Sequence, residues 1–312
     1  MAEWLYEAGI GENRVALVED GRIVEAAIEP PGRLPVGTVA RARLVELLPG
    51  RQGRVTLDTG DDALLDPVPP GLAQGAALSV RITREAIPEP GRPKLPRAAA
   101  ADEDPRPGPT LLDRIGATGH PVRVLLPHQP DEMEAAGWSE LLDEAETGEI
   151  AFPGGALRLS PTPAMTLFDI DGGPPLDRLA LAGAEAAAAA IRRFGIGGSI
   201  GVDFPTLGGK AERQAVAAAI DASLPPPFER TAVNGFGFLQ IVRPRPRASV
   251  PELIRADPVG AAARAALRRL EREPGPPRPH RFPPAVLARI ESEGWDAELM
   301  RRTGRAPIWD RS

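Results

Sequence analysis

Two short apolar segments that carry aspartates, joined by an alanine-rich stretch, constrain the fold of this 312-residue chain more than any other feature. The first segment contains Asp169 and Asp171, separated by one apolar residue, and the second ends at Asp203. Residues 176–194 between them are rich in alanine and are followed by Gly195, as is typical of a helix that ends at a glycine. The order strand, helix, strand predicts an α/β unit with two parallel, neighbouring strands.

This arrangement would bring three carboxylates together. Side chains two positions apart on a strand share a face, so Asp169 and Asp171 would point the same way, and Asp203 would leave the neighbouring strand beside them. Converging carboxylates suit Mg²⁺, which takes one or two protein oxygens and completes its coordination with water or phosphate. The spacing alone leaves a second interpretation equally open, in which Asp171 begins a turn and Asp203 caps a helix.

Several motifs in this part of the chain resemble the catalytic core of the ribonuclease E/G family of bacterial endoribonucleases, in the order and at the spacing of that family. The motifs are Pro153-Gly-Gly-Ala-Leu157, Leu167-Phe-Asp-Ile-Asp171, Glu185-Ala-Ala187, Gly197-Gly-Ser-Ile-Gly-Val-Asp-Phe204 and Asn234-Gly-Phe-Gly-Phe-Leu-Gln-Ile-Val-Arg-Pro-Arg245. The resemblance implies a Mg²⁺-dependent endoribonuclease that cleaves single-stranded RNA to 5′-phosphate and 3′-hydroxyl ends.

The resemblance also implies roles for individual residues. Asp169 and Asp203 would hold Mg²⁺, and Asp171, where the family usually has asparagine, would position the attacking water. The basic residues expected to contact RNA are Arg243 and Arg245, with Arg230 as a further candidate, and Lys94 in a second segment that resembles the family.

The N-terminal third predicts short strands and a small β-barrel. Residues 3–29 favour a hairpin, because Asp20 and Gly21 lie between two apolar runs. Alternating segments at roughly ten-residue spacing follow, as in an oligonucleotide-binding barrel, and the family has an S1-type barrel at this place. Such barrels stack bases on aromatic rings, but residues 7–151 contain only one aromatic residue, Trp138. Arg41 and Arg43 would then either follow a phosphate backbone or form a solvated surface.

The remaining segments depart from the family. Residues 86–110 have the composition of a linker, and residues 98–150 carry 12 acidic and 3 basic side chains, with a strand expected around 122–126 and an acidic helix around 132–146. The family's 5′-monophosphate sensor and its zinc link through paired cysteines have no counterpart, and the chain contains no cysteine. Residues 259–270 predict a helix whose basic face, formed by Arg264, Arg268, Arg269 and Arg272, is either solvated or in contact with RNA. Trp295 and Trp309 are expected to anchor the tail to the body.

We therefore expect an α+β or α/β protein in four parts. These are a hairpin with an S1-like barrel (1–97), an acidic linker or reduced insertion (98–150), a metal-dependent nuclease core (151–247) and an arginine-rich helical tail (248–312). The net charge of −6, the missing cysteines and the lack of a membrane-length apolar run favour a cytoplasmic protein that binds single-stranded RNA and no membrane. Any homodimer would have to form without a zinc link.

Two other functions remain open from the sequence. The first is a non-catalytic RNA-binding protein of the same ancestry, which the missing aromatic residues, sensor and zinc link favour. The second is a structural adaptor that recruits protein partners through its acidic segment and tail. Retention of both candidate metal ligands in register favours the enzyme, because an RNA-binding protein has no need of them.

Overall fold

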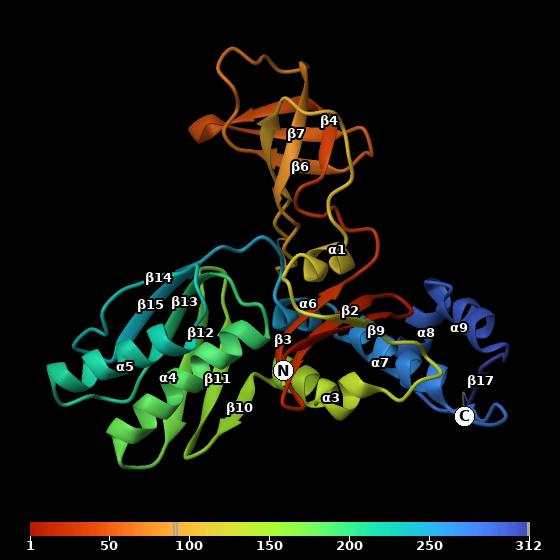
Figure 1. Ribbon diagram of the computed structural model, residues 1–312. Coiled ribbons are helices and arrows are strands. Elements are labelled where there is room, and N and C mark those ends of the chain that lie inside the picture. Colours follow the sequence, from red (N-terminus) through yellow and green to blue (C-terminus); the bar gives the residue numbers. More distant parts are fainter. Residues whose placement is uncertain (90, 92, 311–312) are drawn as a thin grey trace.

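The computed structural model describes residues 1–89, 91 and 93–310 of the chain. Figure 1 shows a small β-barrel standing away from a larger body of sheets and helices, with a group of helices from the C-terminal part of the chain on one side of that body. The mixed α+β class expected from the sequence is confirmed. Within the described residues, no helix combines the length and the apolar character needed to cross a membrane.

The first three strands form part of the body. They pair antiparallel in the order β3-β2-β1, and the later strand β9 joins β1 in parallel. The bounds are β1 Glu3–Ala8, β2 Asn13–Glu19, β3 Arg22–Glu29 and β9 Val122–Val124. Asp20 and Gly21, both at positive φ, make the predicted tight turn between β2 and β3. The hairpin thus packs with the body and not with the barrel.

The barrel is closed, with five strands in the order β4-β5-β6-β8-β7. Its elements are β4 Val39–Leu48, the short 3₁₀ turn η1 Pro49–Arg51, β5 Gln52–Leu57, β6 Asp62–Leu65, β7 Ala77–Arg84 and β8 Arg97–Ala101. The small barrel expected from the sequence is confirmed, and it has a separate apolar core. The linker expected over residues 86–110 is wrong in part, because β8 lies within it and buries Ala98 in that core.

The segment between the barrel and the second sheet contains three helices and one short strand. Its elements are α1 Leu111–Gly116, β9, α2 Glu132–Ala135 and α3 Trp138–Thr147. The single acidic helix expected over residues 132–146 is interrupted at Gly137, whose φ of 98° is incompatible with a continuous helix.

The second sheet has six strands in the order β10-β11-β12-β13-β15-β14. The strands are β10 Glu149–Phe152, β11 Gly155–Pro161, β12 Thr166–Gly172, β13 Gly198–Asp203, β14 Glu229–Arg230 and β15 Phe238–Arg243, and the helices are α4 Leu176–Arg193 and α5 Lys210–Ser223. Gly183 lets α4 approach β12, since a Cβ atom there would lie 2.7 Å from the Ile170 side chain. One continuous apolar core joins this sheet, its helices and the N-terminal hairpin.

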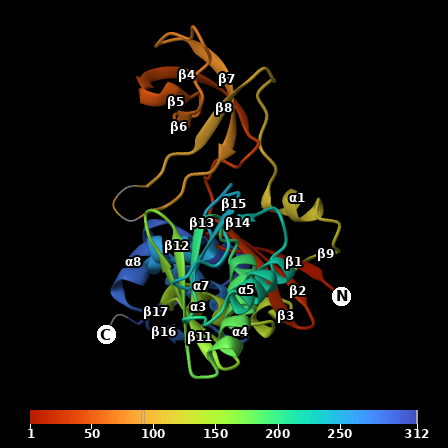
Figure 2. The same cartoon turned by 90° about the vertical axis from the view of Figure 1, so that its left-hand side faces the viewer.

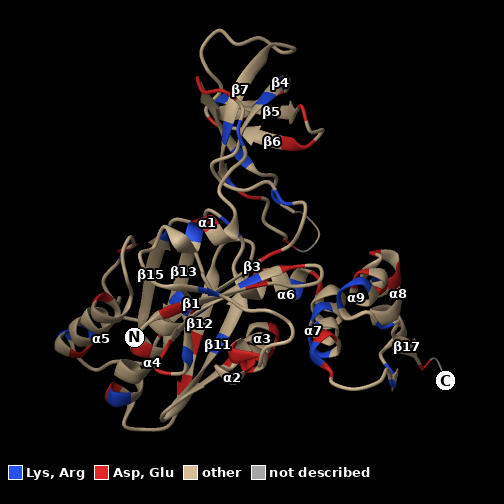
Figure 3. Cartoon of the chain, turned by 45° about the vertical axis from the view of Figure 1, so that its right-hand side comes forward, with Lys and Arg blue, Asp and Glu red and all other residues tan. Residues whose placement is uncertain are grey.

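The tail contains α6 Val250–Ala256, α7 Pro258–Arg272, α8 Pro284–Ser292 and α9 Trp295–Thr303, with the short strands β16 Pro279–His280 and β17 Ile308–Trp309. Trp295 and Trp309 pack in a cluster with Ile10, as the predicted anchoring of the tail requires. The predicted solvated basic face of α7 is wrong for Arg264 and Arg268. Both are buried against Glu12, so their charges hold the tail to the β1–β2 loop. Figure 3 shows acidic and basic residues interspersed along α7, α8 and α9.

Candidate active site

Asp169 and Asp203 occupy facing positions on neighbouring strands. Strands β12 and β13 pair in parallel, with Asp169 opposite Asp203. The parallel pairing follows from the connection through α4, as the strand–helix–strand pattern predicts. Helix α5 begins at Lys210 with Gly209 as its N-cap, so the interpretation of Asp203 as a helix cap is wrong.

All three aspartates lie on the face of the sheet that the helices leave open. Asp169, Asp171 and Asp203 are exposed, whereas their neighbours Phe168 and Ile170 are buried. Successive side chains of a strand point to opposite faces, and the buried set faces α4. Figure 2 shows α4 and α5 together on one side of the sheet. The carboxylates therefore share a surface that a ligand can reach.

Arg158 is a fourth charged residue of this face that the sequence analysis missed. It lies on β11 directly opposite Asp169. Its Nε atom is 3.1 Å from an Asp171 carboxylate oxygen and 3.4 Å from a Glu149 carboxylate oxygen. The alternation of residues 155–161 just before the turn into the aspartate strand was the available signal, since hairpin pairing places Arg158 on the same face as Asp169.

The position of Asp203 on the sheet surface beside Asp169 alters its ionisation. Partial loss of hydration at the sheet surface, and then the negative charge of Asp169, raise the pKa of Asp203 above its ordinary value. A raised carboxyl pKa means that the ionised form is disfavoured. Within the described part of the chain, neither Asp169 nor Asp203 takes part in a side-chain hydrogen bond or an ion pair. A cation between them would relieve this repulsion.

The donor chemistry of the pair fits Mg²⁺. This ion is usually held by one or two carboxylates and keeps several waters or substrate phosphate oxygens in its octahedron. The described residues contain no group of three or more His, Cys, Asp or Glu side chains arranged to hold a metal ion. Asp169 and Asp203 thus match sparse ligation of Mg²⁺ at an open surface and do not match an all-protein cage.

A tight turn lies beside Asp203 and exposes an aromatic ring. Phe238 is opposite Asp203 in the β13–β15 pairing, and the turn of residues 234–237 precedes it. Asn234 Oδ1 accepts hydrogen bonds from the backbone N–H groups of Phe236 and Phe238, at 2.9 and 3.0 Å. The Phe236 side chain points into solvent and is 90% exposed.

The structure does not bring Arg243 and Arg230 to the carboxylates. Arg243 is two residues from the buried Ile241 on β15 and so lies on the helix side of the sheet, where its side chain lines a hollow with Arg192. Arg230 is opposite Ile241 in the pairing of β14 with β15 and makes an ion pair with Asp221 of α5. Both predicted RNA contacts therefore face away from Asp169.

The other predicted basic residues lie toward the barrel. Arg245 makes ion pairs with Glu252 and Glu89, and the Lys94 ammonium is 2.5 Å from Glu89. Arg41 and Arg43 lie on β4, within the barrel. Lys94 also lines a groove of about 990 Å³ between the barrel, the turn at residues 161–163 and α6. These residues are apart from the three aspartates.

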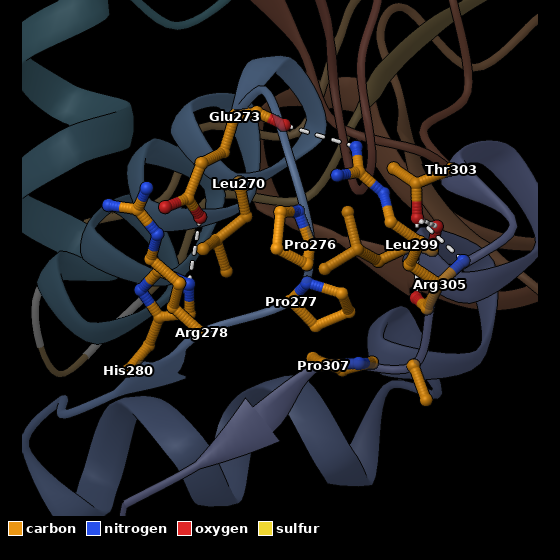
Figure 4. Close-up of a pocket in the computed structure, with 11 residues that line it drawn as sticks. Leu270, Glu273, Pro276, Pro277, Arg278, His280, Leu299, Thr303, Arg305 and Pro307 are labelled. Atoms are coloured by element: carbon orange, nitrogen blue, oxygen red, sulfur yellow. Dashed lines mark hydrogen bonds and ion pairs between the residues drawn. The ribbon is translucent and has the colours of Figure 1, made fainter.

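A small pocket in the tail has no arrangement of catalytic side chains among its described lining residues. Figure 4 shows its lining, which includes Leu270, Pro277 and His280. His280 Nε2 lies 2.8 Å from a Glu273 carboxylate oxygen. The cavity volume of about 30 Å³ admits little more than a water molecule. We regard this pocket as part of the tail packing.

In sequence comparisons, no protein-family model and no curated protein matches this chain.

Proposed function

We propose that this protein is a Mg²⁺-dependent endoribonuclease of the ribonuclease E/G type, which cleaves single-stranded RNA to 5′-phosphate and 3′-hydroxyl ends. The observation that carries the proposal is the facing pair Asp169 and Asp203 on an open sheet face, where neither carboxylate has a hydrogen-bond or ion-pair partner among the residues that the structure describes. Both residues belong to the motifs that resemble this family. A cytoplasmic location is part of the same proposal.

The roles of the three aspartates are those that the resemblance implies, and their places on one open face of the sheet support them. Asp169 and Asp203 would hold Mg²⁺, which supplies Lewis-acid stabilisation of the charge that develops on the scissile phosphate. Asp171 accepts a hydrogen bond from the attacking water and orients it, and its ion pair with Arg158 fixes the carboxylate. Arg158 is also the arginine of this face that can offer positive charge to a phosphate, a role for which Arg243 is on the wrong side of the sheet.

The barrel contributes electrostatic contacts in this proposal. Its S1-like character rests on the resemblance, and its closed five-stranded form is compatible with it. Arg41, Arg43 and Lys94 would contact phosphates of the strand outside the cleavage site. Contacts of this kind give affinity that falls with salt concentration and carries no base preference.

A cleavage assay with a short A/U-rich single strand, labelled at its 5′ end, tests the proposal. We expect cleavage that depends on added Mg²⁺ and stops when EDTA is present, with 5′-phosphate on the downstream product. A ladder that forms equally well in EDTA would contradict a metal-dependent reaction. A 2′,3′-cyclic phosphate on the upstream product would contradict hydrolysis by an activated water.

The runner-up is an RNA-binding protein without catalysis. The observation that favours it is the ion pair between Arg158 and Asp171, because it engages the carboxylate that should orient the water. This candidate predicts binding of the same RNA without cleavage at any Mg²⁺ concentration. The assay above, combined with a gel-shift measurement, separates the two functions.

A further inference from the structure

Phe236 is exposed to an extent that fold stability does not explain. Apart from Met1, no large apolar side chain among the described residues is as exposed; Leu47 follows at 53% and Met300 at 52%. Burial of an aromatic ring is favourable, so a ring held in water contributes little to folding. Single exposed apolar side chains are common, and the meaning of this one depends on what fixes it and what surrounds it.

The ring is carried by a turn with a fixed backbone. Besides the two hydrogen bonds to Asn234 Oδ1, the N–H of Asn234 donates to Phe238 O at 2.9 Å, and the N–H of Gly237 donates to Asn234 O at 3.2 Å. Gly237 has a φ of 88°, and its carbonyl accepts from Phe204 N at 3.1 Å. A Cβ atom on Gly237 would lie 2.5 Å from the Phe204 carbonyl oxygen. The turn is therefore attached directly to the residue that follows Asp203.

An apolar strip runs from this turn across the open face. Phe238 is half-buried, and its ring lies over Gly201, where a Cβ atom would be 2.5 Å from the ring. Leu167 on β12 borders the same glycine, at 2.8 Å from that Cβ position. The face thus presents aromatic surface on β15 next to the carboxylates on β12 and β13.

This alternation of anionic and aromatic surface matches the repeat of a single-stranded nucleic acid. Each nucleotide carries a phosphate, which a divalent cation on the aspartates can take, and a base, whose flat face stacks on an aromatic ring. The barrel cannot supply such a ring, because Trp138 is the one aromatic residue between 7 and 151 and it is fully buried.

We propose that Phe236 is a base-stacking residue, which holds the nucleobase next to the phosphate bound at Asp169 and Asp203. The inference rests on the proposed function for the identity of the strand, and it adds the positioning of one base relative to the cleaved bond. Stacking is tolerant of base identity, so Phe236 would give affinity and register more than sequence preference.

Binding measured without cleavage tests this role. We would follow fluorescence anisotropy of a labelled A/U-rich RNA with Ca²⁺ in place of Mg²⁺, since Ca²⁺ takes the same oxygen ligands. Phe236→Ala should weaken binding by roughly 5- to 100-fold, and Phe236→Trp should retain it. Met300→Ala, an equally apolar deletion on α9, should bind as the wild type does. Because the ring is uncharged, the slope of affinity against salt concentration should not change in Phe236→Ala.

A single abasic nucleotide, moved along the RNA, identifies the stacked base. Wild-type protein should lose affinity most at one position next to the cleaved bond, and Phe236→Ala should be insensitive at that position. Equal affinity of Phe236→Ala and wild type would overturn the inference, as would an abasic profile that the substitution leaves unchanged. Failure of the wild type to bind single-stranded RNA would overturn it as well.

Two further outcomes separate this inference from its alternatives. If Phe236 served as a contact between two copies of the chain, Phe236→Ala would change the mass measured by light scattering, and stacking would be rejected. If wild type bound RNA but never cut it, the proposed catalysis would fail while the loss of affinity in Phe236→Ala would still support stacking. Melting temperatures of wild type and Phe236→Ala should agree, because the side chain is exposed.

Discussion

Two regions of this molecule use carboxylate side chains in opposite ways. Where the tail meets the N-terminal hairpin, Glu12 is buried between Arg264 and Arg268, and Glu7 is buried between Arg14 and Arg272. On the open face of the six-stranded sheet, Asp169 and Asp203 stand side by side, exposed and without a basic partner among the described residues.

The difference separates charges that hold the structure together from charges that are available to a ligand. Buried ion pairs at the tail specify how it docks, because any other placement would leave a charge in the interior without a partner. Facing carboxylates on the sheet oppose each other and weaken the fold slightly. In the proposed function, a cation would join them and remove this repulsion.

The largest effect should come from removing a carboxylate of the open pair. Asp169→Asn or Asp203→Asn should each lower Mg²⁺-dependent cleavage on the order of 1000-fold, as is typical when a group that stabilises transition-state charge is lost. Initial rates at saturating Mg²⁺ measure this. Asp20→Asn in the exposed β2–β3 turn is a matched control and should cleave at the wild-type rate. Full activity in either site variant would refute the assignment.

A large loss of folding stability, as distinct from a loss of cleavage rate, should come from a substitution where the tail meets the N-terminal hairpin. Glu12→Ala would leave Arg264 and Arg268 buried without their carboxylate and should lower the free energy of unfolding by about 3–5 kcal/mol. Urea denaturation measures the change. Glu46→Ala, which removes an exposed ion pair with Arg54 in the barrel, should change it by less than about 1 kcal/mol. Similar losses in the two variants would remove the distinction between buried and exposed charges.

A smaller effect is expected at the 5′ end of the substrate. The three arginines of residues 98–150 are all paired with carboxylates: Arg106 with Glu103, Arg114 with Glu29, and Arg123 with Glu3 and Glu132. A free arginine that bound the terminal phosphate would change the rate more than about tenfold. We therefore expect 5′-monophosphorylated and 5′-hydroxyl RNA to be cut at rates within about threefold in paired time courses. A preference above tenfold would require an anion site elsewhere.

The smallest effect concerns the repulsion between the two aspartates. Because the pKa of Asp203 is raised in the folded state, its contribution to stability is present below the unfolded pKa and is lost as the pH rises through the folded pKa. In EDTA at neutral pH, Asp203→Asn should therefore melt slightly above wild type, and the difference should vanish under acidic conditions. Added Mg²⁺ should raise the melting temperature of wild type more than that of the variant. Differential scanning fluorimetry over pH tests both statements.

Local patterns predicted the elements that position the candidate site. The apolar alternation around Asp169, the alanine-rich stretch and the glycine after it locate β12 and α4. The face to which Arg243 points could also have been predicted from the sequence. Arg243 is two residues from Ile241 on the same strand, so both side chains lie on the buried side of the sheet.

Other features depend on contacts between distant parts of the chain. Residues 97–101, Arg-Ala-Ala-Ala-Ala, have no strand pattern, and they are extended because β6 and β7 pair with them. In the sequence, Arg264 and Arg268 have the spacing of a solvated helix face. In the fold they are paired with Glu12, which precedes them by more than two hundred residues. Neither fact can be read from composition or periodicity.

The place where the barrel leaves the body has a consequence for how the chain folds. Strand β9 must pair with β1 across the whole barrel sequence, and closing so long a loop carries an entropic penalty that grows with loop length. The two connecting segments meet at the base of the barrel, where Val39 and Arg106 exchange two backbone hydrogen bonds of 2.9 Å. A barrel that folds first therefore brings the ends of its own sequence together and shortens the loop that remains to be closed. Folding of the barrel before the body would in this way assist the pairing of β1 with β9.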